Sequence, residues 1–394
     1  MAPATSSRLP ELTVGRVTGV ATGSLRLGTR RFYVGRVTPV AIKEAPVVTR
    51  LNALDRFWLP ALNDPRDIIF VRLSLAITFV QLPFAAVLFA LGSFSWWWAV
   101  AYWLMYFGLF LDKFILMLHC TCHRPLFNRR FRWLNHYIPW VIGPFCGETP
   151  ETYFAHHMGM HHKEGNLHGD LSSTMRYQRD SFGHWLRYFG RFITIGLYEL
   201  WSYHRRHNRH KLARRLLIGE LSFWAVALLL GAFVSWQASL VVFILPVLVV
   251  RALMMSGNWA QHAFVDPEEP ANDFKSSITC VGTRYNRRCF NDGYHIIHHL
   301  KPSLHYSEMD EEFFTNIQRY GEQDAIVFRG LDYFQVWFCL MTKQYNKLAA
   351  AFVHLPGAPE RSEAQVLDLL KRRLVPIPPA QVETGQSRFT VVRV

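Results

Sequence analysis

The sequence predicts an all-α membrane protein with four transmembrane helices in two hairpins, capped by a cytosolic helical domain. Half of the 394 residues are apolar, 15% are aromatic and only 18% are charged, which is too apolar a composition for an ordinary soluble enzyme. Two long runs, 74–111 and 221–250, contain no charged residue. Each run holds about two helices of the roughly 20 residues that cross a bilayer, and many histidines lie outside the runs.

Both charge-free runs contain a break that divides them into two helices. The first run breaks at Gly92–Ser93 and the second near Ser235–Trp236. Tryptophans occupy positions 96–98, directly after the first break, where an interfacial aromatic belt is typical. The four expected spans are about 70–91, 96–118, 216–234 and 237–256.

The distribution of basic residues predicts the orientation. The net charge is +14, but the basic residues do not gather on a recognisable nucleic-acid-binding fold, so no nucleic-acid partner is expected. Neither hairpin tip contains Lys or Arg, whereas the N-terminal arm, segment 119–215 and the region after Arg251 contain many. The positive-inside rule places these regions in the cytosol, at the endoplasmic reticulum or a bacterial inner membrane. The basic arm leaves a plastid location open.

Composition also suggests three regions along the chain. Residues 1–60 form an arm that we expect to be partly disordered, and 61–320 carry the membrane domain. Residues 321–394 are expected to form C-terminal cytosolic helices and a mobile tail, with one short amphipathic helix around Glu363 to Leu374. The six cysteines lack the density of a disulfide scaffold, so we expect them to be reduced.

Histidines form four dense groups at the membrane exits and in the cytosolic segments. Pairs spaced by three or four residues share one helix face, and such spacings recur in three of the groups. The groups are His119 and His123; His156, His157, His161 and His162; His262, preceded by Asn258; and His295, His298 and His299.

Imidazole ligands suit iron, zinc, copper and nickel. Because one zinc site needs only three or four ligands, nine or ten convergent histidines are too many for one ion and about right for two. The alternative for the first group is a zinc site made from His119, Cys120, Cys122 and His123, although five consecutive residues do not easily wrap one tetrahedron. The basic run from His204 to His210 is expected to face lipid headgroups.

The order H-x3-H, H-x3-HH and H-x2-HH around two membrane hairpins resembles the integral-membrane fatty acid desaturase and hydroxylase superfamily. The resemblance covers roughly residues 65 to 320. The NWAQH element, which ends at His262, is similar to the extra Asn-x3-His site of the acyl-CoA desaturase branch, where the His binds one iron and the Asn holds a bound water. HHLKP, which begins at His298, is similar to the HHLxP of several acyl-lipid desaturases.

The resemblance implies a centre of two iron ions per chain, with O2 as co-substrate. The second box departs from the common H-x2-HH pattern, because Met158 stands three residues before His161. His157 is therefore implied as a ligand, with His156 as the alternative, and Asn258 is implied to act through a water. The implied ligands are His119, His123, His157, His161, His162, His262, His295, His298 and His299.

This chemistry suits an unactivated alkyl C–H bond, which has no leaving group and no acidic proton. Carboxylates behind metal-bound imidazoles usually orient the rings; the candidates are Asp112, Glu164, Asp170, Asp273 and Asp292. We also expect an acyl chain to reach the metals along a tunnel lined by first-hairpin aromatics, with membrane anchoring as their alternative role. These aromatics are Trp103, Tyr106, Phe107 and Phe110.

The expected function is O2-dependent desaturation of an acyl chain in a membrane lipid or acyl thioester. The alternatives are hydroxylation or ketolation of an alkane, sphingoid or carotenoid substrate, and, from another class, a zinc-dependent membrane lipid hydrolase. A non-enzymatic metal transporter is disfavoured because the spans carry almost no polar ligands. No dinucleotide fingerprint follows a predicted strand, so we expect an external ferredoxin or b-type cytochrome to supply electrons on the basic cytosolic face.

Overall fold

The computed structural model describes residues 43–379, which are mostly helical. The chain divides into two units, residues 1–35 and 36–394, and the described residues all belong to the second. The expectations of a partly disordered arm and a mobile end therefore concern segments, 1–42 and 380–394, that lie outside the described residues.

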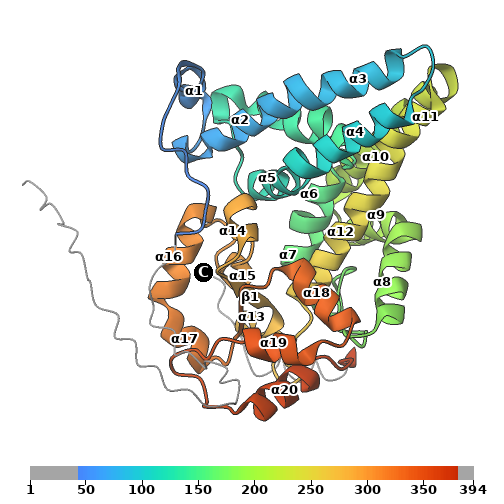
Figure 1. The fold of residues 1–394 in the computed structure, drawn as a ribbon. Helices are drawn as coiled ribbons and strands as arrows, with labels where there is room; N and C mark the ends of the chain where they lie inside the picture. The colour runs from blue at the N-terminus through green and yellow to red at the C-terminus, as the bar shows by residue number, and fades with distance from the viewer. Residues whose placement is uncertain (1–42, 380–394) are drawn as a thin grey trace, which may run out of the picture. The chain divides into compact units, whose positions relative to one another are not determined.

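Four long helices have the length and the apolar composition needed to cross a membrane, which confirms the expected number (Figure 1). Three of them contain a wider, π-helical turn, and two breaks, at 91–95 and 234–235, separate the members of each consecutive pair. The first comprises α2 (Ile68–Ala76) and α3 (Leu82–Ala90), the second α4 (Trp96–Met105) and α5 (Leu111–His123), the third α10 (His210–Phe233), and the fourth α11 (Trp236–Ser239) and α12 (Leu245–Gln261).

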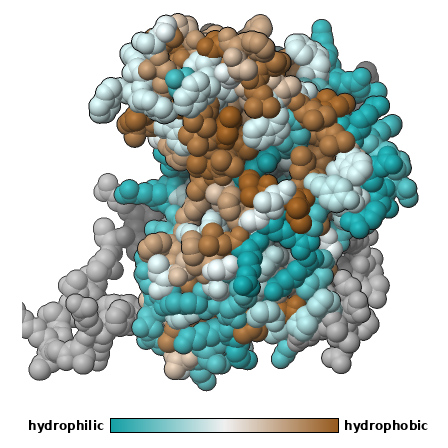
Figure 2. All heavy atoms as spheres, turned by 90° about the vertical axis from the view of Figure 1, so that its right-hand side faces the viewer, coloured by the Kyte–Doolittle hydropathy of each residue, from teal (hydrophilic) through white to brown (hydrophobic). Residues whose placement is uncertain are grey.

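The outer surface of these helices is apolar. Trp97, Leu104 and Phe233 leave 84%, 70% and 82% of their surface exposed. Figure 2 shows hydrophobic residues gathered over the upper part of the molecule and hydrophilic residues over the lower part. Because a large contiguous apolar surface is unfavourable in water, this half of the protein is suited to lipid.

The polar half contains the remaining helices and one feature that an all-α prediction omits. Strands β1 (Ile278–Val281) and β2 (Ile326–Arg329) form a two-stranded parallel sheet, in which Ile278 pairs with Ile326. Buried β-branched residues favour this pairing, and the strand segments are too short to stand out from buried helix in the sequence. The sheet joins the C-terminal helices to the segment that leads into the last histidine group.

The expected amphipathic helix near the C-terminus is present as α20 (Glu363–Arg372). Ser362 and Gln365 form a capping box at its start, while Val366 and Leu370 pack into the core beside β2 and α18. The other helices are α1 (Ala53–Trp58), α6 (Thr152–His156), α7 (His162–Glu164), α8 (Phe182–Thr194), α9 (Gly196–Arg206), α13 (Asp273–Ser276), α14 (Arg284–Arg288), α15 (His295–Leu300), α16 (Met309–Thr315), α17 (Ile317–Glu322), α18 (Tyr333–Met341) and α19 (Tyr345–Ala351).

Candidate metal centre

Eight of the predicted histidine ligands lie in two groups of four. Within each group, one ring nitrogen from every histidine lies within 4.8 Å of the others. The first group uses the end of α5, the turn after α6, and α15; the second uses that same turn, the end of α12, and α15. The first group is His119, His123, His157 and His298, and the second is His161, His262, His295 and His299.

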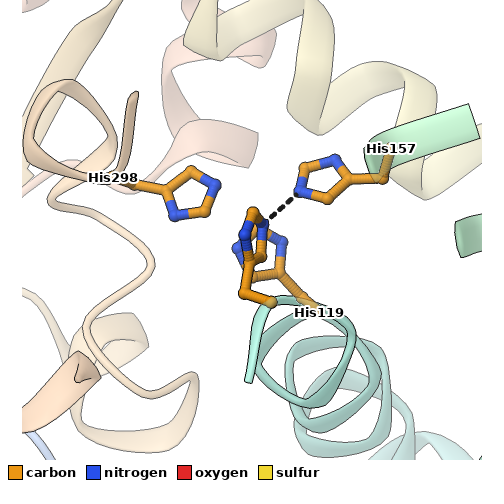
Figure 3. A group of neighbouring side chains, drawn as sticks. His119, His157 and His298 are labelled. Atoms are coloured by element: carbon orange, nitrogen blue, oxygen red, sulfur yellow. Dashed lines mark hydrogen bonds between the residues drawn. The ribbon is translucent and has the colours of Figure 1, made fainter. Parts of the chain in front are cut away.

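The ninth predicted ligand, His162, adjoins the first group. Its Nε2 atom lies 3.1 Å from Nε2 of His157 and 2.9 Å from Nε2 of His298. Figure 3 shows the rings of His157 and His298 directed toward each other, with His119 rising from α5 between them. The structure thus brings all nine histidines together, five around one centre and four around the other.

The second histidine box contributes to both groups, and its backbone is not a regular α-helix. Residues His157–His161 form a π-helical turn, in which the N–H of His162 donates to the carbonyl of His157, five residues earlier. His157 enters the first group and His161 enters the second, although their ring centroids lie only 5.6 Å apart. The sequence, read as an α-helix, predicts one common face for both rings.

His156 joins neither group. Its ring packs against Phe192, 5.7 Å between centroids, and its Nε2 atom has no hydrogen-bond partner among the residues that the structure describes. Of the two candidates in this box, the structure therefore places His157, and not His156, among the converging nitrogens.

The donor set fits metal cations better than a network of hydrogen bonds. Nε2 of His157 lies 2.9 Å from that of His123, and Nε2 of His295 lies 3.2 Å from that of His262. Burial, reinforced by neighbouring imidazoles, lowers the pKa of His262 to about 3 and that of His162 to about 2. A neutral imidazole has one donor and one acceptor nitrogen, so rings that direct their Nε2 atoms toward one another cannot all be paired by hydrogen bonds. The lone pairs of these nitrogens can, however, all bind a cation.

Neither cysteine of the first box belongs to a metal-binding group within residues 43–379. The Cys122 thiol donates to the carbonyl of His119, and Cys120 lies outside both groups. The alternative zinc site, made from the two histidines and two cysteines of this box, is therefore not formed. His119 and His123 instead share their group with His157 and His298.

Asp170, one of the expected carboxylates, bonds directly to the ring of a predicted ligand. Asp170 accepts from Nδ1 of His161 at 2.6 Å, and both side chains are buried. This contact fixes the proton on Nδ1 and leaves Nε2 free for a metal. Further hydrogen bonds from the backbone N–H groups of Asn166 and Ser172 hold the Asp170 carboxylate in place.

The other proposed carboxylates have different partners. Asp292 accepts from Tyr285, Asp112 pairs with Arg288, and Glu164 accepts from Tyr203. Asp273 begins α13, but the ring next to this helix, His262, uses its Nδ1 atom to bond the carbonyl of Ser276 at 2.8 Å. The ring orientation at His262 is thus set by backbone.

Replacing Asp170 by asparagine is expected to lower metal affinity about 10- to 100-fold. The amide keeps the volume of the side chain but no longer has the charge that stabilises the correct tautomer of His161. Titration of the purified protein with a competing chelator would measure the change. An Asp292→Asn variant is the matched control, because Asp292 bonds no ligand ring in the structure, and equal metal loss in both variants would contradict the assignment.

Two buried residues that support the site carried no signal in the sequence. Arg179 is fully buried and donates through Nε to the carbonyl of Ala263, directly after His262. The Glu44 carboxylate accepts from the backbone N–H of Gly282 and from Asn286, in the segment that leads to the third box. Each contact joins residues far apart in sequence, so neither periodicity nor motif spacing reveals it.

One basic-run histidine is also placed differently from the expectation. His204 is fully buried and bonds the carbonyl of Ala155 through Nε2 at 3.0 Å, so it does not face lipid headgroups. Gly159 permits this approach, because a Cβ atom there would lie 2.8 Å from the ring of His204.

A cavity of about 280 Å³ opens beside both histidine groups. Asn258 lies on its wall, as do His161 and His295, and donates to the carbonyl of Ser172 and the hydroxyl of Tyr188, 3.0 and 2.7 Å away. The apolar part of the wall comes from α5, α8, α12 and α18: Leu111, Ile115, Leu116, Phe192, Leu253, Met254, Met255 and Phe334.

The first-hairpin aromatics expected to line a tunnel have other positions relative to this cavity. Tyr106 and Phe110 are buried in the core, and Trp103 donates to the carbonyl of Val241. None of the four proposed aromatics lines the cavity. Helix α5 instead lines the cavity with residues that follow Phe110, from Leu111 to His119.

One carboxyl on the cavity wall has an unusual ionisation. Glu148 is 6% exposed, and burial, with the nearby Glu220 carboxylate adding to it, raises its pKa to about 8 against the opposing charge of Arg251. A carboxyl whose pKa is raised on folding stabilises the protein fully below its unfolded pKa. That contribution is lost as pH rises through the folded pKa.

We therefore expect the stability of the wild-type protein to fall between about pH 4.5 and pH 8 relative to a Glu148→Gln variant, which cannot ionise. The difference should grow by at most about 1.4 kcal/mol for each pH unit. Thermal unfolding in detergent across this range would measure it. If the stability of the two proteins changed equally with pH, Glu148 would be ionised in the folded state.

Comparison with known protein families gives an independent result. The family model described as fatty acid desaturase matches residues 95–330, which is more than half of the chain and includes all nine histidines of the two groups. Neither the curated proteins nor the solved structures contain a match to this chain. The four apolar helices and the family match together indicate a membrane protein with an oxidoreductase function. The chain belongs to the fatty acid desaturase family.

Proposed function

We propose that this protein is an O2-dependent di-iron desaturase that introduces a double bond into the acyl chain of a membrane lipid or acyl thioester. The proposal rests on one observation above all: nine buried or half-buried histidines converge as a set of five and a set of four beside a mostly apolar cavity. Family membership supports the same class of reaction.

The two histidine sets would each hold one iron. Two irons bound there would supply activated oxygen, which is able to remove hydrogen from an unactivated C–H bond. The protein's own side chains prepare this chemistry: Asp170 fixes the tautomer of His161, and Tyr153 lies 3.0 Å from Nδ1 of His119. The apolar wall of the cavity would position the chain and keep bulk water away from the metals.

A zinc-dependent hydrolase fits the site less well. Catalytic zinc uses about three protein ligands and a water, which would leave six of the nine converging histidines without a role. Two metals with imidazole ligands account for all nine.

The electron donor is proposed to be a separate acidic protein that docks on the cytosolic face near the end of α5. Arg124 directly follows His123, and the exposed Arg129 and Arg130 lie a few residues further on. Electrostatic docking of this kind weakens as salt screens the charges. Turnover driven by a ferredoxin or b-type cytochrome should therefore slow as ionic strength rises.

Production of the full chain in a host whose lipids are profiled by mass spectrometry would test the proposed reaction. The expected result is a new double bond in host acyl chains, absent from cells that produce a His299→Ala variant. A new hydroxyl group in its place would identify a hydroxylase of the same family. Unchanged lipids, with folded and metal-loaded protein and a competent donor, would contradict the proposal.

A further inference from the structure

The cavity beside the metal centre has a polar compartment, which lies next to the second histidine group because the ring of His156 is 6.5 Å from that of His161. Arg251 and His262 are separated by about three turns of helix, roughly 16 Å along the axis, and Arg251 and Gln261 both line the cavity. Glu148, Thr152 and His156 join Arg251 in the compartment. A second, smaller cavity shares Thr152, His156 and Arg251, so polar groups continue beyond the compartment.

Two side-chain atoms in this compartment lack a partner. Oε1 of Glu148 and Nε2 of His156 are buried and make no hydrogen bond to any residue within 43–379. Burying a polar group without a partner costs free energy, and native proteins rarely retain such groups without a reason. Both residues line the cavity, so a molecule inside it could bond both atoms.

The charges around the compartment favour a neutral ligand. The guanidinium of Arg251 already bonds Glu220 at 2.7 Å and Thr149 at 3.1 Å. Thr152 donates to the same Glu220 oxygen at 2.8 Å. Because Arg251 is balanced by Glu220, no cation remains for an anionic ligand. Glu148, whose raised pKa keeps it protonated at neutral pH, offers both a donor and an acceptor.

We propose that the substrate is an oxygenated lipid whose neutral hydroxyl group enters this compartment and hydrogen-bonds to Glu148 and His156. A hydroxyl both donates and accepts, which matches the two unpartnered atoms, whereas a plain alkyl chain would leave them unpaired. The inference rests on the proposed function, since it specifies the lipid class that the same cavity takes. Glu148 and His156 are thereby specificity-determining residues.

Equilibrium binding of radiolabelled 1-dodecanol and dodecane to the full-length, metal-loaded protein would test this inference. The detergent should carry no hydroxyl group. The ratio of the two affinities is compared between the wild-type protein and a Glu148→Met variant, so that differences in micelle partitioning cancel. We expect the preference for the alcohol to fall about tenfold in the variant, with dodecane bound equally well or better.

Three further measurements sharpen the result. Glu148→Gln, which keeps a donor and an acceptor, should retain most of the preference, and Glu311→Met, which makes the same substitution at an exposed acid, should retain all of it. Labelled dodecanoate should bind more weakly than the alcohol. The same alcohol-to-alkane ratio in the wild-type and Glu148→Met proteins would overturn the inference, because the compartment would then hold only water.

This binding assay does not depend on turnover. A protein that shows the alcohol preference but forms no new double bond or hydroxyl would refute the proposed function while supporting the binding site. A desaturase with no alcohol preference would overturn the inference alone.

Discussion

Replacing His157 by alanine is expected to remove one of two bound metal ions and to abolish lipid oxidation. Nε2 of His157 lies 2.9 Å from that of His123 and 3.1 Å from that of His162, so His157 sits in the middle of the five-histidine set. Loss of a central ligand should have a larger effect than the 10- to 100-fold that is typical of residues behind the ligands. Elemental mass spectrometry and lipid profiling measure the two effects.

His156→Ala is the matched control, because it removes the neighbouring imidazole from the same turn. His156 lies in neither group of converging nitrogens, so this variant should retain both metals. Its substrate preference should change, as expected for a cavity wall residue. Metal loss in the His156 variant and not in the His157 variant would reverse the assignment of the second box.

Replacing Arg179 by alanine is expected to destabilise the protein by about 3 kcal/mol or more. Its buried guanidinium donates to the carbonyls of Ala263, Arg373 and Val375, at 2.7, 2.8 and 2.6 Å. The carbonyls of Ala263 and Arg373, whose bonds to Arg179 are buried, would be left unpaired in the variant. The contacts also join the segment after α20 to the residue that follows His262, so metal retention should fall together with stability.

Thermal unfolding in detergent would measure this effect, with an expected decrease in Tm of roughly 6 °C or more. Arg187→Ala is the control, since Arg187 is exposed on α8, and its Tm should stay near that of the wild-type protein. If the two variants unfolded at the same temperature, the Arg179 contacts would contribute nothing measurable.

Much of the fold follows from features that are local in sequence. The absence of charge over 74–111 and 221–250 predicts four long helices, and the structure places them at Pro65–Ala90, Trp96–His123, His210–Phe233 and Trp236–Gln261. Both hairpin breaks also lie where small polar residues interrupt the runs. The length of the apolar runs predicts these helices. This prediction is strong for a membrane protein, because backbone N–H and C=O groups without hydrogen bonds are very costly inside a bilayer.

The sequence predicts which histidines belong to the candidate metal centre, but it does not predict how they divide into two groups. The resemblance of the histidine boxes to the desaturase and hydroxylase superfamily implies the nine histidines that the structure brings together. The division of His157 and His161 between the groups depends on which histidines from distant segments lie beside each ring, and spacing within one box does not show this. The polar compartment around Glu148 and the carbonyl contacts of Arg179 join distant segments, so only the folded chain reveals them.

The metal content of the detergent-purified wild-type protein tests the central claim most directly. Elemental mass spectrometry should find close to two irons per chain, because the structure provides one set of five and one set of four converging histidines. About one zinc per folded chain, with no iron, would contradict the di-iron centre and favour hydrolytic chemistry at a single metal.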